Sequence, residues 1–298
     1  MPVIKNVAVI GAGTMGARIA AVMARAGFNV RLWSRSTQTL QTARSLIESL
    51  GVTAAVHYSS RLETCLEDAD MVSENVAEDV TLKQRLLQTI EQQVSADCLL
   101  TTNTSSVSIS LLATALRDPS RLIGMHWFNP ADIMPMIEIV RGEKTREAIC
   151  RQVRELCQQL DKETITVNQD IPGFIINRLQ YAMLREALYL VSAGIGSVED
   201  IDRAVQRTLA PRWAAMGPMK LMDFAGLDTV EKVAAILLPT LDNSSTLPDW
   251  LKETIATGKL GAKSGAGFYS WPDDSALTAM QQRDKRVKSL MDGNAENE

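Results

Sequence analysis

The chain has 298 residues, of which 46% are hydrophobic and 22% are charged, a composition typical of a globular protein with one large or two ordinary domains. The formal net charge of −4 offers no basic footprint for nucleic acid. No apolar run reaches the roughly 18 residues that a membrane span needs. We therefore expect neither a nucleic-acid-binding nor a membrane protein.

The first residues and the cysteines favour a cytoplasmic protein. The stretch MPVIKNVAVIGAG runs directly into a strand-like segment and lacks the layout of a secretory signal. The four cysteines, Cys65, Cys98, Cys150 and Cys157, include no CxxC pair, and two histidines are too few to complete a usual zinc site with them. We expect reduced thiols and no metal.

A β-α-β pattern opens the chain. The apolar run 7–10 predicts a strand, and small and apolar residues then recur at helical spacing up to Gly27. A second strand is predicted at 29–33, followed by a helix that begins after Ser36 and ends near Leu50. This unit of about 30 residues is typical of a doubly wound α/β sheet.

The alternation of strands and helices continues to about residue 167. Further strands are predicted at 55–59, 70–76, 97–103, 121–127, 135–140 and 163–167, with helices at 61–70, 80–94 and 144–160. The pattern predicts a Rossmann-like domain over residues 1–170.

Beyond residues 169–171 only helical spacing is found, so we expect an all-helical second domain over residues 171–298. Ser197 and Asp200 have the spacing of a capping box. Further helices are predicted at 218–226, 228–238 and 248–257. The polar tail, from about residue 279, is expected to fray.

A glycine motif lies between the first strand and the first helix. Gly11, Gly13 and Gly16 form GxGxxG, which encloses Thr14 and Met15. The first glycine permits a tight turn, the second lets the backbone approach a pyrophosphate, and the third lets helix and strand pack closely. The position of the motif predicts a dinucleotide site.

A histidine and a glutamate lie on two neighbouring predicted strands. A dehydrogenase must take a proton from its alcohol as hydride leaves, and imidazole titrates near neutrality. A buried Glu138 would orient His126 and stabilise its charged form. The alternative is a core histidine that is satisfied by the backbone.

Six further segments carry distinctive motifs. They are ENVAED at 74–79, TTNTSS at 101–106, GMHWFNP at 124–130, DIPGFIINR at 170–178, MGPMKLMDFAGLD at 216–228 and GAKSGAGFYSW at 261–271. With the N-terminal glycines, they resemble the 3-hydroxyacyl-CoA dehydrogenase family over residues 5 to about 271. The resemblance implies a Rossmann-like domain, a helical domain that forms a homodimer, and an NAD(P)-dependent oxidation of a hydroxyl group.

The resemblance also implies roles for single residues. His126 matches the catalytic base and Glu138 its paired carboxylate, while Ser105 and Asn177 match residues that hold the substrate. Residues expected near the nicotinamide ribose are Glu78, Lys83 and Asn103. Each has a structural alternative: Asn103 and Ser105 as turn formers, Glu78 and Lys83 as a solvated helix pair.

The chain departs from the family after its second helix. The resemblance implies that members acting on acyl-CoA carry a long, lysine-rich helical hairpin at this place, which contacts the CoA portion of the substrate. Here, Val52 to Asp70 contains no lysine and one arginine. The segments at 178–195 and 212–219 resemble a branch with the gulonate, carnitine and pyridine-alcohol dehydrogenases, whose substrates carry no CoA. A small 3-hydroxy acid is favoured; an acyl-CoA substrate, or a structural or sensing protein without turnover, stays open.

The end of the second strand bears on the cofactor. The fingerprint expects an acid about 20 residues beyond the glycines, to accept hydrogen bonds from the ribose 2′-hydroxyl. Here Ser34 occupies that place, Arg35 and Ser36 follow, and no acid occurs from residue 28 to 47. A guanidinium binds a 2′-phosphate with charge-assisted bonds. NADP is therefore favoured over NAD, the alternative being an NAD enzyme that has lost its acid.

Overall fold

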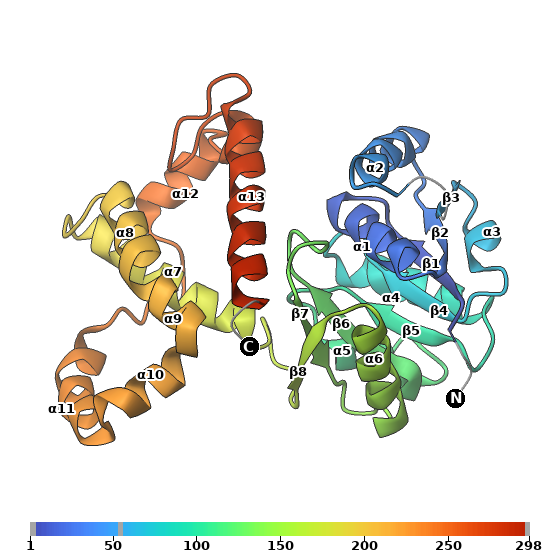
Figure 1. Cartoon of the computed structure of the whole chain (residues 1–298), viewed down its shortest axis with the longest axis horizontal. Coiled ribbons are helices and arrows are strands. Elements are labelled where there is room, and N and C mark those ends of the chain that lie inside the picture. The colour runs from blue at the N-terminus through green and yellow to red at the C-terminus, as the bar shows by residue number, and fades with distance from the viewer. Residues whose placement is uncertain (1–3, 53–55, 296–298) are drawn as a thin grey trace. The chain divides into compact units, whose positions relative to one another are not determined.

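The computed structural model describes residues 4–52 and 56–295. The chain divides into two compact units (Figure 1). The first contains the sheet, ends at Asn177 and resumes at Arg283, whereas the second is Arg178–Gln282. The expected boundary after residue 170 stays a prediction.

Eight strands form one sheet in the order β3-β2-β1-β4-β5-β6-β7-β8. All neighbours are parallel except β6 and β7, which are antiparallel. The chain winds outward from β1 in both directions, which is the doubly wound topology that the sequence predicts. The strands are β1 (Asn6–Ile10), β2 (Asn29–Trp33), β3 (Val56–Ser59), β4 (Met71–Glu74), β5 (Leu99–Thr102), β6 (Leu122–Trp127), β7 (Met136–Val140) and β8 (Glu163–Val167). Residue 55, the first of the predicted third strand, lies outside the described residues.

Helices cover both faces of the sheet, so its central strands are apolar on both sides. One face packs against α1 (Thr14–Arg25), α2 (Thr37–Ser49) and α6 (Glu147–Gln159). The other packs against α3 (Leu62–Leu66), α4 (Val80–Glu91) and α5 (Ile109–Ala113). A short 3-10 turn, Pro119–Arg121, precedes β6. The carboxyl ends of β1, β4, β5 and β6 therefore meet at one edge of the sheet.

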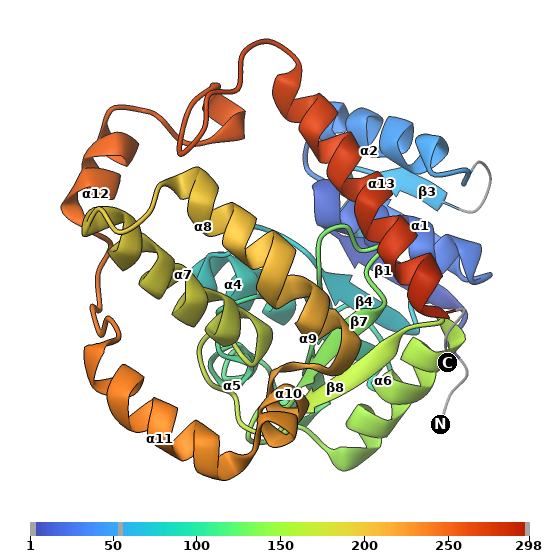
Figure 2. The same cartoon turned by 60° about the vertical axis from the view of Figure 1, so that its left-hand side comes forward.

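The remaining helices follow α7 (Ile176–Ser192). The N-cap of α8 is Ser197, whose hydroxyl accepts from the backbone N–H of Asp200, which is one half of the predicted capping box, and donates to the Asp200 carboxylate. Figure 2 shows α8 and α9 as one rod, joined by a π-helical segment. The elements are α8 (Val198–Ala204), the π-helix Val205–Leu209, α9 (Ala210–Met216), α10 (Pro218–Ala225), α11 (Leu227–Leu237), the 3-10 turn Leu238–Thr240, α12 (Asp249–Ala256), the 3-10 turn Ala262–Ser264 and α13 (Ser275–Ala295). Within the described ranges, no helix has the length and apolar character to cross a bilayer.

The expectation that the tail frays from about residue 279 is wrong for the residues that the structure describes. Helix α13 continues to Ala295. Asp284 forms an ion pair with Arg18 of α1 at 3.3 Å, and the half-buried residues of the helix are Ser275, Ala276, Ala279, Asp284, Val287 and Met291. A composition rich in charge hid this helix, because most of its charged residues lie at exposed positions.

Candidate active site

The glycine turn between β1 and α1 has the shape of a dinucleotide cradle. Gly11 has a φ of +111°, and a Cβ there would lie 2.6 Å from the carbonyl oxygen of Asn75. A Cβ on Gly16 would overlap the carbonyl oxygen of Gly11. At Gly13 a Cβ would meet no described atom within 4 Å. Gly11 and Gly16 thus permit close packing, and Gly13 leaves the backbone open to a pyrophosphate.

The rest of the predicted fingerprint supports the turn instead of lining the space above it. Thr14 is exposed and begins α1, directly after its N-cap Gly13. Met15 is half-buried and packs against the core beneath α1. Both residues lie at the helix N-terminus, where backbone N–H groups favour an anion.

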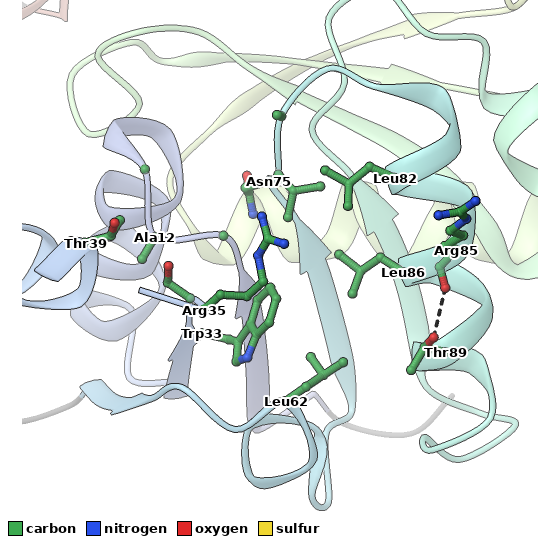
Figure 3. A pocket seen from close by; sticks show the side chains of 15 residues that line it. Ala12, Trp33, Arg35, Thr39, Leu62, Asn75, Leu82, Arg85, Leu86 and Thr89 are labelled. Carbon is green, nitrogen blue, oxygen red and sulfur yellow. Dashed lines mark hydrogen bonds between the residues drawn. The ribbon is translucent and has the colours of Figure 1, made fainter. Parts of the chain in front are cut away.

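A cavity of about 490 Å³ opens beside this turn. Its walls come from the β1–α1 turn, the end of β2, the loop after β4 and one stripe of α4 (Figure 3). The residues that line it are Gly11, Ala12, Gly13, Trp33, Ser34, Arg35, Thr39, Leu62, Asn75, Val76, Ala77, Leu82, Arg85, Leu86 and Thr89. Apolar walls with a few polar groups suit a nucleoside.

Two arginines and no acid are among the described residues that line this cavity. Figure 3 shows Arg35 extending over the cavity from the end of β2, with Leu82 and Leu86 projecting from α4 on the opposite side. Within the described part of the chain, the guanidinium groups of Arg35 and Arg85 form no ion pair or hydrogen bond with the protein. The Ser36 hydroxyl caps α2 by accepting from the backbone N–H of Thr39, as expected.

His126 and Glu138 are direct partners in the antiparallel pairing of β6 and β7. Nδ1 of His126 lies 2.6 Å from Oε2 of Glu138. His126 is 5% exposed and Glu138 is 0% exposed. Because the other carboxylate oxygen, Oε1, accepts from the backbone N–H groups of Ile175 and Ile176 at 3.0 and 2.9 Å, Glu138 is an acceptor on both sides. Nδ1 therefore carries the proton, and Nε2 is left with its lone pair.

Two aromatic rings restrict the imidazole further. The ring centroid of Phe128 lies 4.6 Å from that of His126, and the centroid of Phe174 lies 5.6 Å away. Phe174 is 1% exposed and has a φ of +51°, a conformation that a bulky residue adopts only when its surroundings impose it. The two rings and Glu138 leave the Nε2 edge as the working edge of His126.

Ser105 lies in the turn that follows β5, held by Glu78. Oε1 of Glu78 accepts from the backbone N–H groups of Ser105 and Ser106, both at 2.9 Å, and from the Thr104 hydroxyl at 2.6 Å. The side chain of Asn177, on α7, donates to the carbonyl oxygen of Ser105 at 3.2 Å. The structure therefore places Asn177 and Ser105 together.

Asn103 ties this turn to the strand that carries the histidine. Its side-chain oxygen accepts from the backbone N–H of Trp127, the neighbour of His126, at 2.8 Å. Asn103 is thus used within the protein, as is Glu78, and neither lines the cavity described above.

Lys83 is not part of a solvated helix pair, which was the structural alternative for it. The residue is 1% exposed, and its ammonium contacts both oxygens of Glu74, at 2.9 and 3.0 Å. Glu74, Trp33, Arg85 and Phe174 were missed as site residues. The sequence signal for Glu74 was its place at the end of a buried strand, where a carboxylate needs a partner.

No group of three or more metal-binding side chains lies close together in the described ranges.

The ionisation of Glu78 gives a test of this geometry. Burial alone would raise the pKa of Glu78, but hydrogen bonds from Thr104, the charge of Lys83, and hydrogen bonds from Ser105 and Ser106 lower it from 4.5 to about 2. A folded-state pKa below the unfolded value stabilises the fold above about pH 4.5, and that stability is lost as the pH falls toward 2. We expect the melting temperature of the wild type to fall more steeply over this range than that of Glu78→Gln.

The matched control is Glu143→Gln, at an exposed carboxylate, which should keep the wild-type slope. Parallel curves for wild type and Glu78→Gln would contradict the hydrogen bonding described here.

Comparisons with known proteins agree with this geometry. Residues 6–171 match the NAD binding domain of 3-hydroxyacyl-CoA dehydrogenase, and residues 173–271 match its C-terminal domain. A relative from Mesorhizobium japonicum, 5-formyl-3-hydroxy-2-methylpyridine 4-carboxylate 5-dehydrogenase, is 32% identical and covers 97% of this chain and 99% of its own. A crystal structure of an enzyme of that name, described as an NAD+ dependent dismutase, has a TM-score of 0.92 at 32% identity, over 97% of this chain and 98% of the other.

A structure of (S)-3-hydroxybutyryl-CoA dehydrogenase from Ralstonia eutropha has a TM-score of 0.74 at 32% identity, over 91% of this chain and 100% of the other. Both domains of one family thus match, in the order in which the fold presents them. The chain is an oxidoreductase that belongs to the 3-hydroxyacyl-CoA dehydrogenase family.

Proposed function

We propose that this dehydrogenase transfers a hydride between a nicotinamide dinucleotide and the secondary alcohol of a small 3-hydroxy acid. The observation that carries the proposal is the buried His126–Glu138 pair on β6 and β7. It lies in the same sheet as the glycine cradle at the end of β1. A base and a dinucleotide site are the two parts that alcohol oxidation requires.

When bound, the dinucleotide supplies the nicotinamide ring that accepts the hydride from the carbinol carbon. His126 takes the hydroxyl proton at Nε2 as that carbon becomes a carbonyl. The resulting imidazolium still donates its Nδ1–H to Glu138, whose negative charge stabilises the cation in a buried site. In the reverse direction, the same Nε2 returns the proton to the alkoxide oxygen.

Ser105 and Asn177 hold the substrate oxygen in this proposal. The Ser105 hydroxyl lies 3.3 Å from Glu78, and it rotates to donate to a carbonyl or accept from a hydroxyl. Asn177 fixes the Ser105 backbone and keeps the rest of its amide group for substrate. The held oxygen is the one that exchanges a proton with His126.

A small substrate is favoured by the short connection between α2 and β3. Helix α2 ends at Ser49 and β3 begins at Val56, which leaves no length for the helical hairpin expected in acyl-CoA members. The relative from Mesorhizobium japonicum is named for a pyridine substrate without CoA. An L-3-hydroxyacyl-CoA is the second candidate, because the Ralstonia eutropha structure is named for that activity.

A substrate panel tests the function and the role of the base together. We expect turnover of at least one free 3-hydroxy acid, and a lower kcat/KM for the matching CoA thioester. His126→Gln and Glu138→Gln should lower kcat by roughly 10²–10⁴, the scale of lost general acid–base catalysis. Dinucleotide affinity should hardly change, since neither residue lines the cavity.

The matched control is His57→Gln, at the other histidine, which is exposed on β3 and should leave kcat unchanged. Saturating activity on acetoacetyl-CoA with none on any free hydroxy acid would overturn the substrate proposal. Near wild-type turnover by His126→Gln would overturn the mechanism.

For the cofactor, NADP is proposed over NAD. What supports this is the end of β2, where Ser34 and Arg35 line the cavity and no described lining residue is acidic. An unpaired guanidinium there is free to bind a 2′-phosphate, which an acid would repel. The relative described as NAD+ dependent keeps NAD as the second candidate.

The cofactor preference is tested by Ser34→Asp/Arg35→Gln. We expect wild type to have the higher kcat/KM with NADP, and the double variant to shift toward NAD by at least about tenfold, or about 1.4 kcal/mol. The measurement is kcat/KM for both cofactors in both proteins. Equal use of both cofactors by wild type, unchanged in the variant, would mean that Arg35 does not read the phosphate.

The helical unit supports a homodimer. No described residue of α8 to α12 is buried, and large apolar side chains are exposed, among them Met219 at 82%, Phe224 at 73% and Ile236 at 70%. Helices of this size without a core of their own need a partner surface. A second copy is the proposed partner, as in the family.

Light scattering at micromolar concentration tests the dimer. We expect twice the chain mass of 32.7 kDa, and a shift toward the single chain mass in Ile236→Glu, which puts a charge on the apolar surface. Glu231→Gln, at an exposed residue on the same helix, should remain a dimer. A wild-type mass of one chain would refute the proposal.

The cytoplasm is the proposed compartment. The four cysteines are free and buried, and burial raises the pKa of Cys98 and of Cys157 to about 12. Unreactive, reduced thiols fit a reducing compartment.

A further inference from the structure

Helix α4 carries two stripes of side chains that face different surroundings. Leu82, Arg85, Leu86 and Thr89 line the dinucleotide cavity, at the spacing of one helix face. Lys83, Leu87 and Ile90 are buried against the sheet, on another face. Residues two positions apart on a helix point about 200° away from each other around its axis. Lys83 and Arg85 therefore serve different parts of the site.

The ammonium of Lys83 is occupied entirely by protein oxygens. It contacts Glu74 Oε1 and Oε2 at 2.9 and 3.0 Å, the carbonyl oxygen of Val76 at 3.2 Å and Glu78 Oε2 at 3.3 Å. An ammonium has three donors, so four acceptors exhaust it. Lys83 is 1% exposed and does not line the cavity, which leaves it no donor for a ribose hydroxyl.

Glu74 is the counter-ion that makes this burial possible. It is 0% exposed, and its carboxylate also accepts from the Val76 backbone N–H at 2.7 Å and from the Thr102 hydroxyl at 2.6 Å. An ammonium without such a partner would not stay charged inside the sheet. Glu74 thus joins the end of β4, the loop after it and the end of β5 around one cation.

Glu78 carries the effect of this cation to the substrate side. Its Oε2 faces Lys83, while its Oε1 accepts from the backbone N–H groups of Ser105 and Ser106. Since one carboxylate has a single plane, holding Oε2 sets where Oε1 points. The turn that presents Ser105 is therefore aligned by a charge that the substrate does not contact.

We propose that Glu74 and Lys83 are positioning residues, which act through Glu78 to hold the turn of Ser105 in place for the alcohol substrate. This rests on the proposed function, in which Ser105 holds the substrate oxygen. In this structure the Lys83 ammonium is enclosed on the core side of α4, away from the residues that line the cavity.

The test uses the double variant Glu74→Gln/Lys83→Met in the full-length protein. Both charges are removed together, since Lys83→Met alone would leave Glu74 as a buried carboxylate without a counter-ion. The rate of hydrogen–deuterium exchange at the Ser105 and Ser106 amides measures the stability of the turn and does not require turnover. We expect exchange at least about tenfold faster there, with unchanged exchange in the amides of β1.

Kinetics read the consequence for the substrate. We expect kcat/KM for the alcohol to fall by about 10²-fold, the effect of misplacing a contact by about 1 Å, and the Kd of the dinucleotide to stay within about twofold of wild type. In a Ser105→Ala background, the same double substitution should reduce kcat/KM by much less, because the residue that it positions is gone. The matched control, Arg85→Gln, two residues along α4, should show the reverse: weaker dinucleotide binding and unchanged exchange at 105 and 106.

Two outcomes would overturn the proposal. Unchanged exchange at 105 and 106, with a Kd for the dinucleotide raised about tenfold, would make Lys83 a cofactor contact. Faster exchange with normal kinetics would show that the turn does not position the substrate. If wild type turned over no alcohol of the panel, the proposed function would fail, and the exchange result would still decide whether Glu74 and Lys83 hold the turn.

Discussion

Everything at the proposed catalytic centre depends on one carboxylate that is buried completely. An unpaired charge at that depth would be strongly destabilising, and Glu138 is tolerated because each of its oxygens is a hydrogen-bond acceptor. Its partners lie outside its own strand β7: they are His126 on β6, and Ile175 and Ile176 at the start of α7. The same bonds that satisfy the charge therefore fix the direction of the imidazole and the start of the helix that follows the sheet.

Hydrogen bonds and short backbone segments around this carboxylate together close into a ring. From Glu138 the ring passes to the first turn of α7, where Asn177 donates to the Ser105 backbone. From the turn of Ser105 it returns through Asn103 to Trp127, next to His126. A closed ring of this kind restricts each member through its neighbours, which is how a site of four side chains is preorganised before substrate enters.

At the carboxyl edge of the sheet, two faces of α4 contribute to different parts of the site. The stripe of α4 that contains Arg85 shapes the dinucleotide cavity, whereas the stripe that contains Lys83 is part of the interior. A buried ion pair is a weak source of stability, because desolvation offsets most of its attraction. Its value here is geometric, since Glu74, Lys83 and Glu78 connect β4, α4 and the turn after β5.

The sequence by itself determined the features that depend on local spacing: the glycine turn with Gly11, Gly13 and Gly16, the capped helix after Ser36, the doubly wound order of strands and the pairing of His126 with Glu138. These follow from neighbours along the chain, or from two strands that a short loop joins. Only the tertiary structure decided that Lys83 is enclosed by Glu74 and Glu78, that Phe174 packs against the imidazole with a positive φ, and that the polar tail forms α13. The physical reason is that burial, charge compensation and strain are set by residues distant in the chain, and no local pattern of spacing records which of them will meet.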